Sequence, residues 1–300
     1  MPGAAAPLRA KIRSMRPPPP RPAFLPLVRL ALAEDLRGGD LTSELLLPTE
    51  RPGRAVIEAR EPLVVCGLPV VACVFGEVDP AVRFVPRRNE GERARPGETL
   101  AELEGPIRSL LAAERTALNF LGRLAGIATL TRRCVELVAG TRARIVDTRK
   151  TLPGWRVLDK YATAVGGATN HRFGLDDGIL LKDNHVAAAG GVGPAVKRVL
   201  AGAPHHLRVQ VEVESLAEAR EAVEAGADFL LLDNLAPAEI ATIVEELAER
   251  TVIEASGGIA PENLRAVAET GVHRISVGRL THSAPAADVA LEMRTGGASA

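Results

Sequence analysis

Val209-Gln210-Val211 leads into Glu212-Val213-Glu214, and further along the chain Phe229-Leu230-Leu231-Leu232 leads into Asp233-Asn234. The same pattern, a short apolar run that stops at polar or glycine residues before a helical segment, occurs six times between Arg142 and Gly278. The other four runs are Ala143-Arg144-Ile145-Val146, Gly178-Ile179-Leu180-Leu181, Val252-Ile253 and Ile275-Ser276-Val277. Short apolar strands separated by helix-length segments are typical of parallel βα units. In such folds the functional site lies at the carboxyl ends of the strands.

The rest of the chain predicts a second, different domain before these units. Four short apolar runs separated by glycine and proline turns predict strands over Arg54–Ala59, Pro62–Gly67, Val82–Pro86 and Thr99–Leu103. A helix is expected over Phe24–Leu36, another near Pro69–Phe75, and a long amphipathic one from Ile107 to Val138.

The predicted architecture is an incomplete α/β barrel of about six to seven strands, preceded by an N-terminal α+β sandwich domain with a mixed sheet. The seventh barrel element is expected near Ala162–Asn170, and a last helix over Pro285–Met293. The expected boundaries are a flexible tail over 1–22, the N-terminal domain over 23–124, the barrel over 125–293 and a C-terminal tail over 294–300.

Composition describes an ordinary globular protein without a charge bias. Of the 300 residues 46% are hydrophobic and 25% charged, and Lys plus Arg (37) equals Asp plus Glu (37). This balance gives no reason to expect nucleic acid or an anionic membrane surface as a partner. No apolar stretch approaches the roughly 18 to 20 residues that span a bilayer. Cys66, Cys73 and Cys134 are odd in number and lack metal-ligand spacing, which favours buried thiols and a cytoplasmic location.

The strand ends carry an unusually polar set of residues. Arg149, Lys150 and Lys182 follow the first two strands, and Glu212 and Asp233 follow the middle two. The last two strands lead into the turns Ser256-Gly257-Gly258 and Gly278. A rim with a cationic side, two acids and glycine turns suits one substrate with carboxylates, another with phosphates, and a divalent metal.

Five basic residues are candidates for gripping two carboxylates, because Arg binds a carboxylate in a fork while Lys and His donate single hydrogen bonds. Each such bond contributes roughly 1.5 to 3 kcal/mol. The same residues could instead be exposed cations or ion pairs with Asp147 and Asp183. The five are Arg149, Lys150, His171, Arg172 and Lys182.

The two acids and the glycine turns suggest the other half of the site. Glu212 and Asp233 each follow an apolar run, so we expect them to face a metal, a ribose hydroxyl group or a cation rather than lie buried without a partner. Glu214 lies on the same face as Glu212 if the strand continues, so a shared role stays open. Ser256-Gly257-Gly258 and Gly278 would offer bare backbone amides to a phosphate, although Ser-Gly-Gly alone is often only a turn.

The chain resembles the quinolinate phosphoribosyltransferase family, also called nicotinate-nucleotide pyrophosphorylase (carboxylating), from about Ala31 to Met293. The resemblance is carried by several ordered motifs. They are Ala31–Leu36 with Gly39–Thr42, Glu114–Leu121, Asp147–Gly154, Gly166–Arg172, Leu181–His185, Leu231–Asn234, Glu254–Ile259 and Val277–Ser283.

What the resemblance implies is conversion of quinolinate and phosphoribosyl pyrophosphate, with Mg²⁺, to nicotinate mononucleotide, pyrophosphate and CO₂ in NAD biosynthesis. It implies substrate contacts from the five basic residues above and from Ser256, Gly257, Gly258 and Gly278. Lys150, Lys182, Glu212 and Asp233 would be catalytic, and Glu212 and Asp233 would bind ribose and Mg²⁺. It also implies a homodimer in which Arg115 reaches the partner's site, and leaves open any higher oligomer.

Two positions depart from the family pattern. Ala168 stands where a third glycine is usual, which would strain a positive φ, and Arg279 replaces a small residue. Neither position carries a charge on which the expected chemistry depends.

Three rival functions stay open at this point. A barrel aldolase with Lys182 as Schiff-base amine would leave four charged residues of the rim without a purpose, namely Arg149, Arg172, Glu212 and Asp233. A relative that acts on another pyridine carboxylate or in molybdenum transport would share the motifs. A non-catalytic dimeric binding protein would share the fold.

Overall fold

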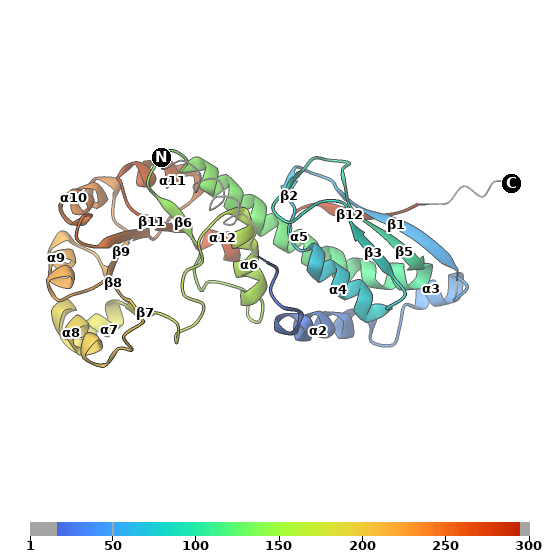
Figure 1. Ribbon diagram of the computed structural model, residues 1–300, viewed down its shortest axis with the longest axis horizontal. Coiled ribbons are helices and arrows are strands. Elements are labelled where there is room, and N and C mark those ends of the chain that lie inside the picture. Colours follow the sequence, from blue (N-terminus) through green and yellow to red (C-terminus); the bar gives the residue numbers. More distant parts are fainter. Residues whose placement is uncertain (1–16, 50, 295–300) are drawn as a thin grey trace, which may run out of the picture. The chain divides into compact units, whose positions relative to one another are not determined.

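Six parallel strands form the sheet of the second half of the chain in the computed structural model, which describes residues 17–49 and 51–294 (Figure 1). All six apolar runs predicted as strands are strands. In chain order they are β6 (Arg144–Val146), β7 (Ile179–Leu181), β8 (Val209–Val213), β9 (Phe229–Asp233), β10 (Val252–Ser256) and β11 (Arg274–Ser276). The sheet order is β6-β11-β10-β9-β8-β7, with every pairing parallel.

Helices follow these strands because the intervening segments have an apolar stripe with helical spacing. In α10 (Pro237–Leu247), for example, Ile240, Ile243, Val244 and Leu247 are buried. Figure 1 shows α8, α9 and α10 along the outer side of the sheet. The remaining helices of this part are α7 (Asp183–Ala189), α8 (Val192–Gly202), α9 (Leu216–Glu224), α11 (Pro261–Glu269) and α12 (Arg279–His282).

The register of the parallel strands brings their carboxyl ends to one level. Leu231 of β9 pairs with Glu212 of β8 on one side and with Glu254 of β10 on the other, and Asp233 pairs with Ser256. Paired residues of parallel strands lie on the same face of a sheet. The acids and Ser256 therefore face the same side, toward the end where the site was predicted.

The expected seventh barrel element is a single bridge rather than a strand. Thr169 forms an isolated parallel bridge with Val146: its N–H donates to Ile145 O (2.9 Å) and its carbonyl accepts from Asp147 N (3.2 Å). The preceding residues form α6 (Arg156–Gly166). Strands β6 and β7 lie at the two ends of the sheet order, which confirms the incomplete barrel.

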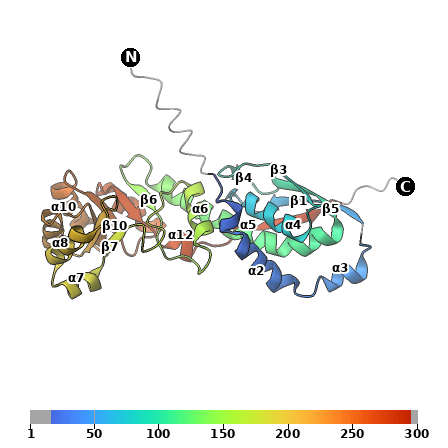
Figure 2. The ribbon, with the colours of Figure 1, turned by 60° about the horizontal axis from the view of Figure 1, so that its bottom comes forward.

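The N-terminal part is an antiparallel sheet with helices, as Figure 2 shows for α4 and α5 beside β1 and β5. The sheet has the order β12-β1-β5-β3, and β2 pairs separately with β4. Every helix and strand predicted between Phe24 and Val138 has a counterpart here. None of the described helices has the length and apolarity to cross a membrane. The elements are the 3₁₀ helix η1 (Arg21–Ala23), α2 (Leu25–Leu36), α3 (Leu41–Leu46), β1 (Pro52–Ala59), β2 (Leu63–Val64), α4 (Leu68–Val78), β3 (Arg83–Pro86), β4 (Arg93–Ala94), β5 (Thr99–Pro106), α5 (Ile107–Leu137) and β12 (Val289–Met293).

The helix predicted over Pro285–Met293 was wrong, because its second half is strand β12. This strand pairs antiparallel with β1, with Ala59 opposite Val289 and Ala55 opposite Met293. Ala, Leu, Glu and Met favour a helix, but pairing with a strand distant in sequence overrides local propensity. The prediction of a mixed sheet was also wrong, because all pairings of this sheet are antiparallel. Strand partners depend on contacts between distant segments, which sequence patterns do not show.

Two glycines inside α5 make room for the returning chain. A side chain on Gly126 would lie 2.0 Å from the Pro285 carbonyl oxygen, and one on Gly122 would lie 2.9 Å from that of Ala287. The Ala287 N–H also donates to Gly122 O (2.8 Å). Glycine costs up to about 1 kcal/mol of helix propensity, and here it permits this close approach.

The described residues divide by their contacts into two compact units, each made of separate stretches of the chain. The first contains 17–49, 51–132, 152–167 and 284–294, and the second contains 133–151 and 168–283. The expected boundary at 124 falls inside helix α5. Of the expected tails, 1–16 and 295–300 lie outside the described residues. Arg21 already begins η1 and pairs with Glu77, and Arg294 pairs with Glu58.

Candidate functional site

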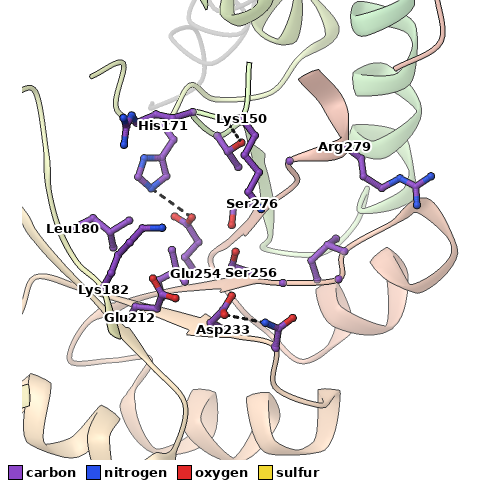
Figure 3. Close-up of a pocket in the computed structure, with 18 of the residues that line it drawn as sticks. Lys150, His171, Leu180, Lys182, Glu212, Asp233, Glu254, Ser256, Ser276 and Arg279 are labelled. Carbon is purple, nitrogen blue, oxygen red and sulfur yellow. Dashed lines mark hydrogen bonds and ion pairs between the residues drawn. The ribbon is translucent and has the colours of Figure 1, made fainter. Parts of the chain in front are cut away.

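A pocket of about 570 Å³ lies at the carboxyl ends of the six parallel strands, and all its lining residues belong to the second unit (Figure 3). Every site residue predicted in that unit lines it, so the predicted convergence is confirmed, whereas the chemical roles stay predictions. These residues are Arg149, Lys150, His171, Arg172, Lys182, Glu212, Asp233, Ser256, Gly257, Gly258 and Gly278. The remaining predicted residue, Arg115, is exposed on α5 in the first unit.

One side of the pocket is cationic. Lys150 and Lys182 are exposed just after β6 and β7, and Arg172 is half-buried with its Nη1 donating to Gly178 O (2.8 Å). Burial lowers the pKa of Arg172, and the neighbouring charge of Arg149 lowers it further. Like charges held this close favour an anion between them. The cationic side therefore suits a ligand with two carboxylates.

The turn that carries His171 and Arg172 is held by the buried acid Asp147. The Asp147 carboxylate accepts from Asn170 Nδ2 (2.7 Å) and from the His171 backbone N–H (2.8 Å). Asp147 has no exposed surface, so these bonds satisfy a carboxylate that water does not reach. Asp147 thereby positions the basic turn.

The acidic side is formed by Glu212 and Asp233. Glu212 lies within β8, and Asp233 is the last residue of β9, where it accepts from Asn234 Nδ2 (2.9 Å). Burial raises the pKa of Glu212, the charge of Asp233 raises it further, and Lys182 opposes both. Two mutually repelling carboxylates suit a cation, and Mg²⁺ is commonly held by one or two carboxylates together with substrate phosphates. Glu214 is exposed and lies outside this lining, so the idea of a shared role is not supported.

Replacing Glu212 with glutamine is expected to stabilise the unliganded protein at neutral pH. A carboxyl group whose pKa is raised in the folded state lowers stability at pH values above its unfolded pKa. This destabilisation is absent below about pH 4, grows as pH rises toward the folded pKa, and is constant above it. We expect Glu212→Gln to raise the free energy of unfolding by at most about 1 kcal/mol, because solvent screens the carboxylate. Urea unfolding at acidic and neutral pH measures this.

A suitable control for that experiment is Glu245→Gln, because Glu245 is exposed on α10 away from the pocket. It should leave the free energy of unfolding unchanged at both pH values. Equal stabilisation by Glu212→Gln at acidic and neutral pH would contradict the assigned electrostatic cause.

The glycine turn after β10 is required by its backbone and its neighbours. Gly257 and Gly258 have φ angles of 86° and 58°. A side chain on Gly257 would lie 2.2 Å from Asn234 Oδ1, whereas one on Gly258 would meet nothing within 4 Å. Gly278 has ordinary φ, but a side chain there would lie 3.1 Å from Lys150 Cδ. Because glycine has no side chain, these lining positions would let a ligand phosphate approach the neighbouring backbone amides.

The two departures from the family pattern have different consequences. Ala168 does not adopt a positive φ, since the left-handed position before it belongs to Gly167 (φ 110°), so the alanine is not strained. Arg279 is exposed at the edge of the pocket lining, and its side chain points away from Lys182 and Glu212 in Figure 3.

Sequence reasoning assigned no role to Glu254 or Gln210. Glu254 lies two residues before Ser256 in β10, and Gln210 lies two residues before Glu212 in β8. Strand alternation places each on the same face as the predicted residue, which is the signal that would have found them. His282, Asn234 and Ser276 also line the pocket.

Comparisons with known proteins give the same relatives along both parts of the chain. The family model described as the quinolinate phosphoribosyl transferase N-terminal domain matches residues 40–125, and the C-terminal domain model matches 127–292. A probable nicotinate-nucleotide pyrophosphorylase [carboxylating] of Bacillus subtilis is 41% identical over 260 residues, covering 87% of this chain and 90% of the relative. The human nicotinate-nucleotide pyrophosphorylase [carboxylating] is 41% identical over 282 residues, covering 90% and 93%.

A solved structure agrees in fold. The nicotinate-nucleotide pyrophosphorylase from Francisella tularensis superposes with a TM-score of 0.88 at 36% identity, covering 92% of this chain and 98% of that one. The similarity therefore extends over nearly the whole length of both chains.

Proposed function

Because the chain belongs to the quinolinate phosphoribosyl transferase family, we propose that it transfers the phosphoribosyl group of phosphoribosyl pyrophosphate to quinolinate with loss of CO₂. The products are nicotinate mononucleotide and pyrophosphate, and the pathway is NAD biosynthesis. The observation that carries the proposal is a pocket whose cationic side, acidic pair and glycine turns match a two-acid ring and an activated sugar.

Quinolinate would lie on the cationic side of the pocket. Arg149, Arg172, Lys150 and Lys182 offer charged donors to its two carboxylates, and His171 lies in the same wall. Charge-assisted hydrogen bonds contribute roughly 1.5 to 3 kcal/mol each, so several of them can orient a small dianion. The role of these residues is to aim the ring nitrogen at the sugar carbon C1.

Phosphoribosyl pyrophosphate would lie between the acids and the glycine turns. The backbone amides of Ser256, Gly257, Gly258 and Gly278 would receive phosphate oxygens. Glu212 and Asp233 would hold ribose hydroxyl groups and Mg²⁺, and bound Mg²⁺ would neutralise negative charge on the departing pyrophosphate. The two carboxylates would also stabilise positive charge that develops at C1.

The chemistry then requires positioning more than acid–base catalysis. The bond between C1 and the pyrophosphate oxygen breaks, pyrophosphate leaves with the electron pair, and the ring nitrogen donates its pair to C1. The ring nitrogen becomes positively charged, which stabilises the electron pair left on the ring carbon when the adjacent carboxylate leaves as CO₂. That carbon takes up a proton, and we assign Lys182 as the candidate donor at this end of the pocket.

The homodimer with Arg115 shared across the interface is also part of the proposal. Arg115 is exposed on α5, so its guanidinium is available to a second copy of the chain. The first unit also exposes three leucines of α3, Leu41 (71%), Leu45 (89%) and Leu46 (74%). Clustered exposed leucines favour burial against a protein partner, which supports subunit contact through this unit.

A cytoplasmic location fits the cysteines. Cys66, Cys73 and Cys134 are free and buried, and burial raises the pKa of each thiol. Buried protonated thiols are unreactive, and unpaired cysteines suit a reducing compartment.

The decisive assay compares two pyridine carboxylates. With phosphoribosyl pyrophosphate and Mg²⁺, we expect release of pyrophosphate and CO₂ with quinolinate, and at least about a hundredfold less pyrophosphate with nicotinate, because nicotinate lacks the second carboxylate for the cationic side. Equal rates with nicotinate, or no release with quinolinate, would contradict the proposed substrate.

A further inference from the structure

Glu254 is a buried carboxylate that the proposed mechanism does not use. It lies in the middle of β10, lines the pocket and is only 1% exposed. Neither of its oxygens has a partner with good hydrogen-bond geometry within the described part of the chain, although Gln210 and Ser276 lie near enough to lower its pKa. Burial without full pairing destabilises a charged group by several kcal/mol, as an order of magnitude, so a residue of this kind implies a role in the site.

The groups around Glu254 come from several elements. The nearest ionisable partner is His171, whose Nε2 lies 3.6 Å from Glu254 Oε1. A dashed line marks this pair in Figure 3. Burial raises the pKa of Glu254, and His171, Gln210 of β8 and Arg274 of β11 oppose this in turn. The side chain is therefore enclosed by basic and amide groups inside the sheet, with His171 on its pocket side.

Both ring nitrogens of His171 are engaged by the protein. Nδ1 accepts from the backbone N–H of Arg172 (2.7 Å), so the ring proton must be on Nε2. Nε2–H donates to Gln210 Oε1 (3.0 Å), with the Glu254 carboxylate as the second acceptor nearby. The ring is thus held at its Nε2 edge by Gln210 of β8 and at its Nδ1 edge by the backbone of Arg172.

We propose that Glu254, together with Gln210, is a positioning residue that holds the Nε2 edge of His171 and, through Nδ1, sets the backbone of Arg172 for quinolinate binding. This deepens the proposed function and rests on it. Glu254 does not contact the substrate in this scheme. It acts by fixing a histidine whose other nitrogen orients the main chain of a carboxylate-binding arginine.

Loss of the Glu254 carboxylate is expected to affect the KM of one substrate and not that of the other. Removing the carboxylate with Glu254→Ala should raise KM for quinolinate by about tenfold or more, comparable with the loss when a partner that orients a metal-binding histidine is removed. KM for phosphoribosyl pyrophosphate should stay within about twofold, because its contacts are assigned to other residues. Glu254→Gln keeps the side-chain shape and an oxygen that can face Nε2 at the same place, so it should recover most of the lost affinity.

A double-mutant cycle with His171→Asn tests whether Glu254 acts through that ring. If it does, Glu254→Ala should add less than about twofold in the His171→Asn background. Thr251→Val is the matched control, because Thr251 immediately precedes the same strand at its other end and donates to Asp228 O (2.9 Å). It should alter stability alone and leave both KM values unchanged.

The outcomes are distinct. This inference alone is overturned if the wild-type protein turns over quinolinate and Glu254→Ala leaves its KM unchanged. The same conclusion follows if Glu254→Ala raises both KM values equally, or if its effect is additive with that of His171→Asn. Wild-type protein that does not use quinolinate overturns the proposed function instead. Urea unfolding of each variant shows whether it is folded under assay conditions, and Glu254→Gln provides the test if Glu254→Ala does not fold.

Discussion

Replacing Lys182 with alanine is expected to lower kcat/KM for quinolinate by at least about a hundredfold, with the fold intact. Lys182 follows β7, is exposed into the pocket, and lies close enough to Glu212 for its charge to oppose the rise in the pKa of that residue. Its ammonium group is proposed to bind a quinolinate carboxylate and to donate the proton that the ring carbon takes up after CO₂ leaves. Steady-state release of pyrophosphate, with circular dichroism to verify folding, is the measurement.

Two further variants make that result specific. Lys197 is an exposed lysine of α8 that does not line the pocket, so Lys197→Ala should retain full activity. Lys182→Arg keeps the charge but not the geometry, and should recover part of the binding but little of the turnover. Activity of Lys182→Ala within a few-fold of the wild type would remove Lys182 from the mechanism.

Mixing inactive Arg115→Ala chains with inactive Lys182→Ala chains is expected to restore activity. In a mixed dimer with shared sites, the Arg115→Ala chain supplies an intact pocket with Lys182, and its partner supplies the intact Arg115. One of the two sites is then complete. Random exchange at equal concentrations makes half of the dimers mixed, so activity should reach roughly a quarter of the wild-type value.

The control for this experiment is Arg133→Ala, which removes another exposed arginine of α5. That variant should be active by itself. Subunit exchange must be demonstrated independently, for example with two differently tagged chains that co-purify after mixing. Demonstrated exchange without recovery of activity would contradict the contribution of Arg115 to the partner's site.

Much of the barrel and its rim could be predicted because the information is local. Parallel strands are apolar on both faces, so each appears as a short apolar run, and the polar residues at its end are adjacent in sequence. Lys182, Asp233 and Ser256 could therefore be placed at one end of the sheet without coordinates. The role of Arg115 and the identity of the substrates were predicted from the family motifs, because hydrophobic and charge patterns alone do not specify them.

Contacts between distant segments could not be predicted from local sequence patterns. The segment ending in Met293 has helix-favouring residues but forms strand β12, because β1 offers unpaired backbone groups to it. The bridge at Thr169 and the glycines of α5 likewise depend on neighbours far along the chain.

The six βα units, the charged and glycine residues at their ends, and the family could all be predicted from the amino-acid order, since these depend on local periodicity and on ordered motifs. Folding adds that Glu254, Gln210 and His171 meet at the pocket wall, that Asp147 holds the basic turn, and that Gly257 must be glycine. Those relations join residues from different strands and turns. Their distances follow from strand register and backbone conformation, which arise only when the whole sheet has formed.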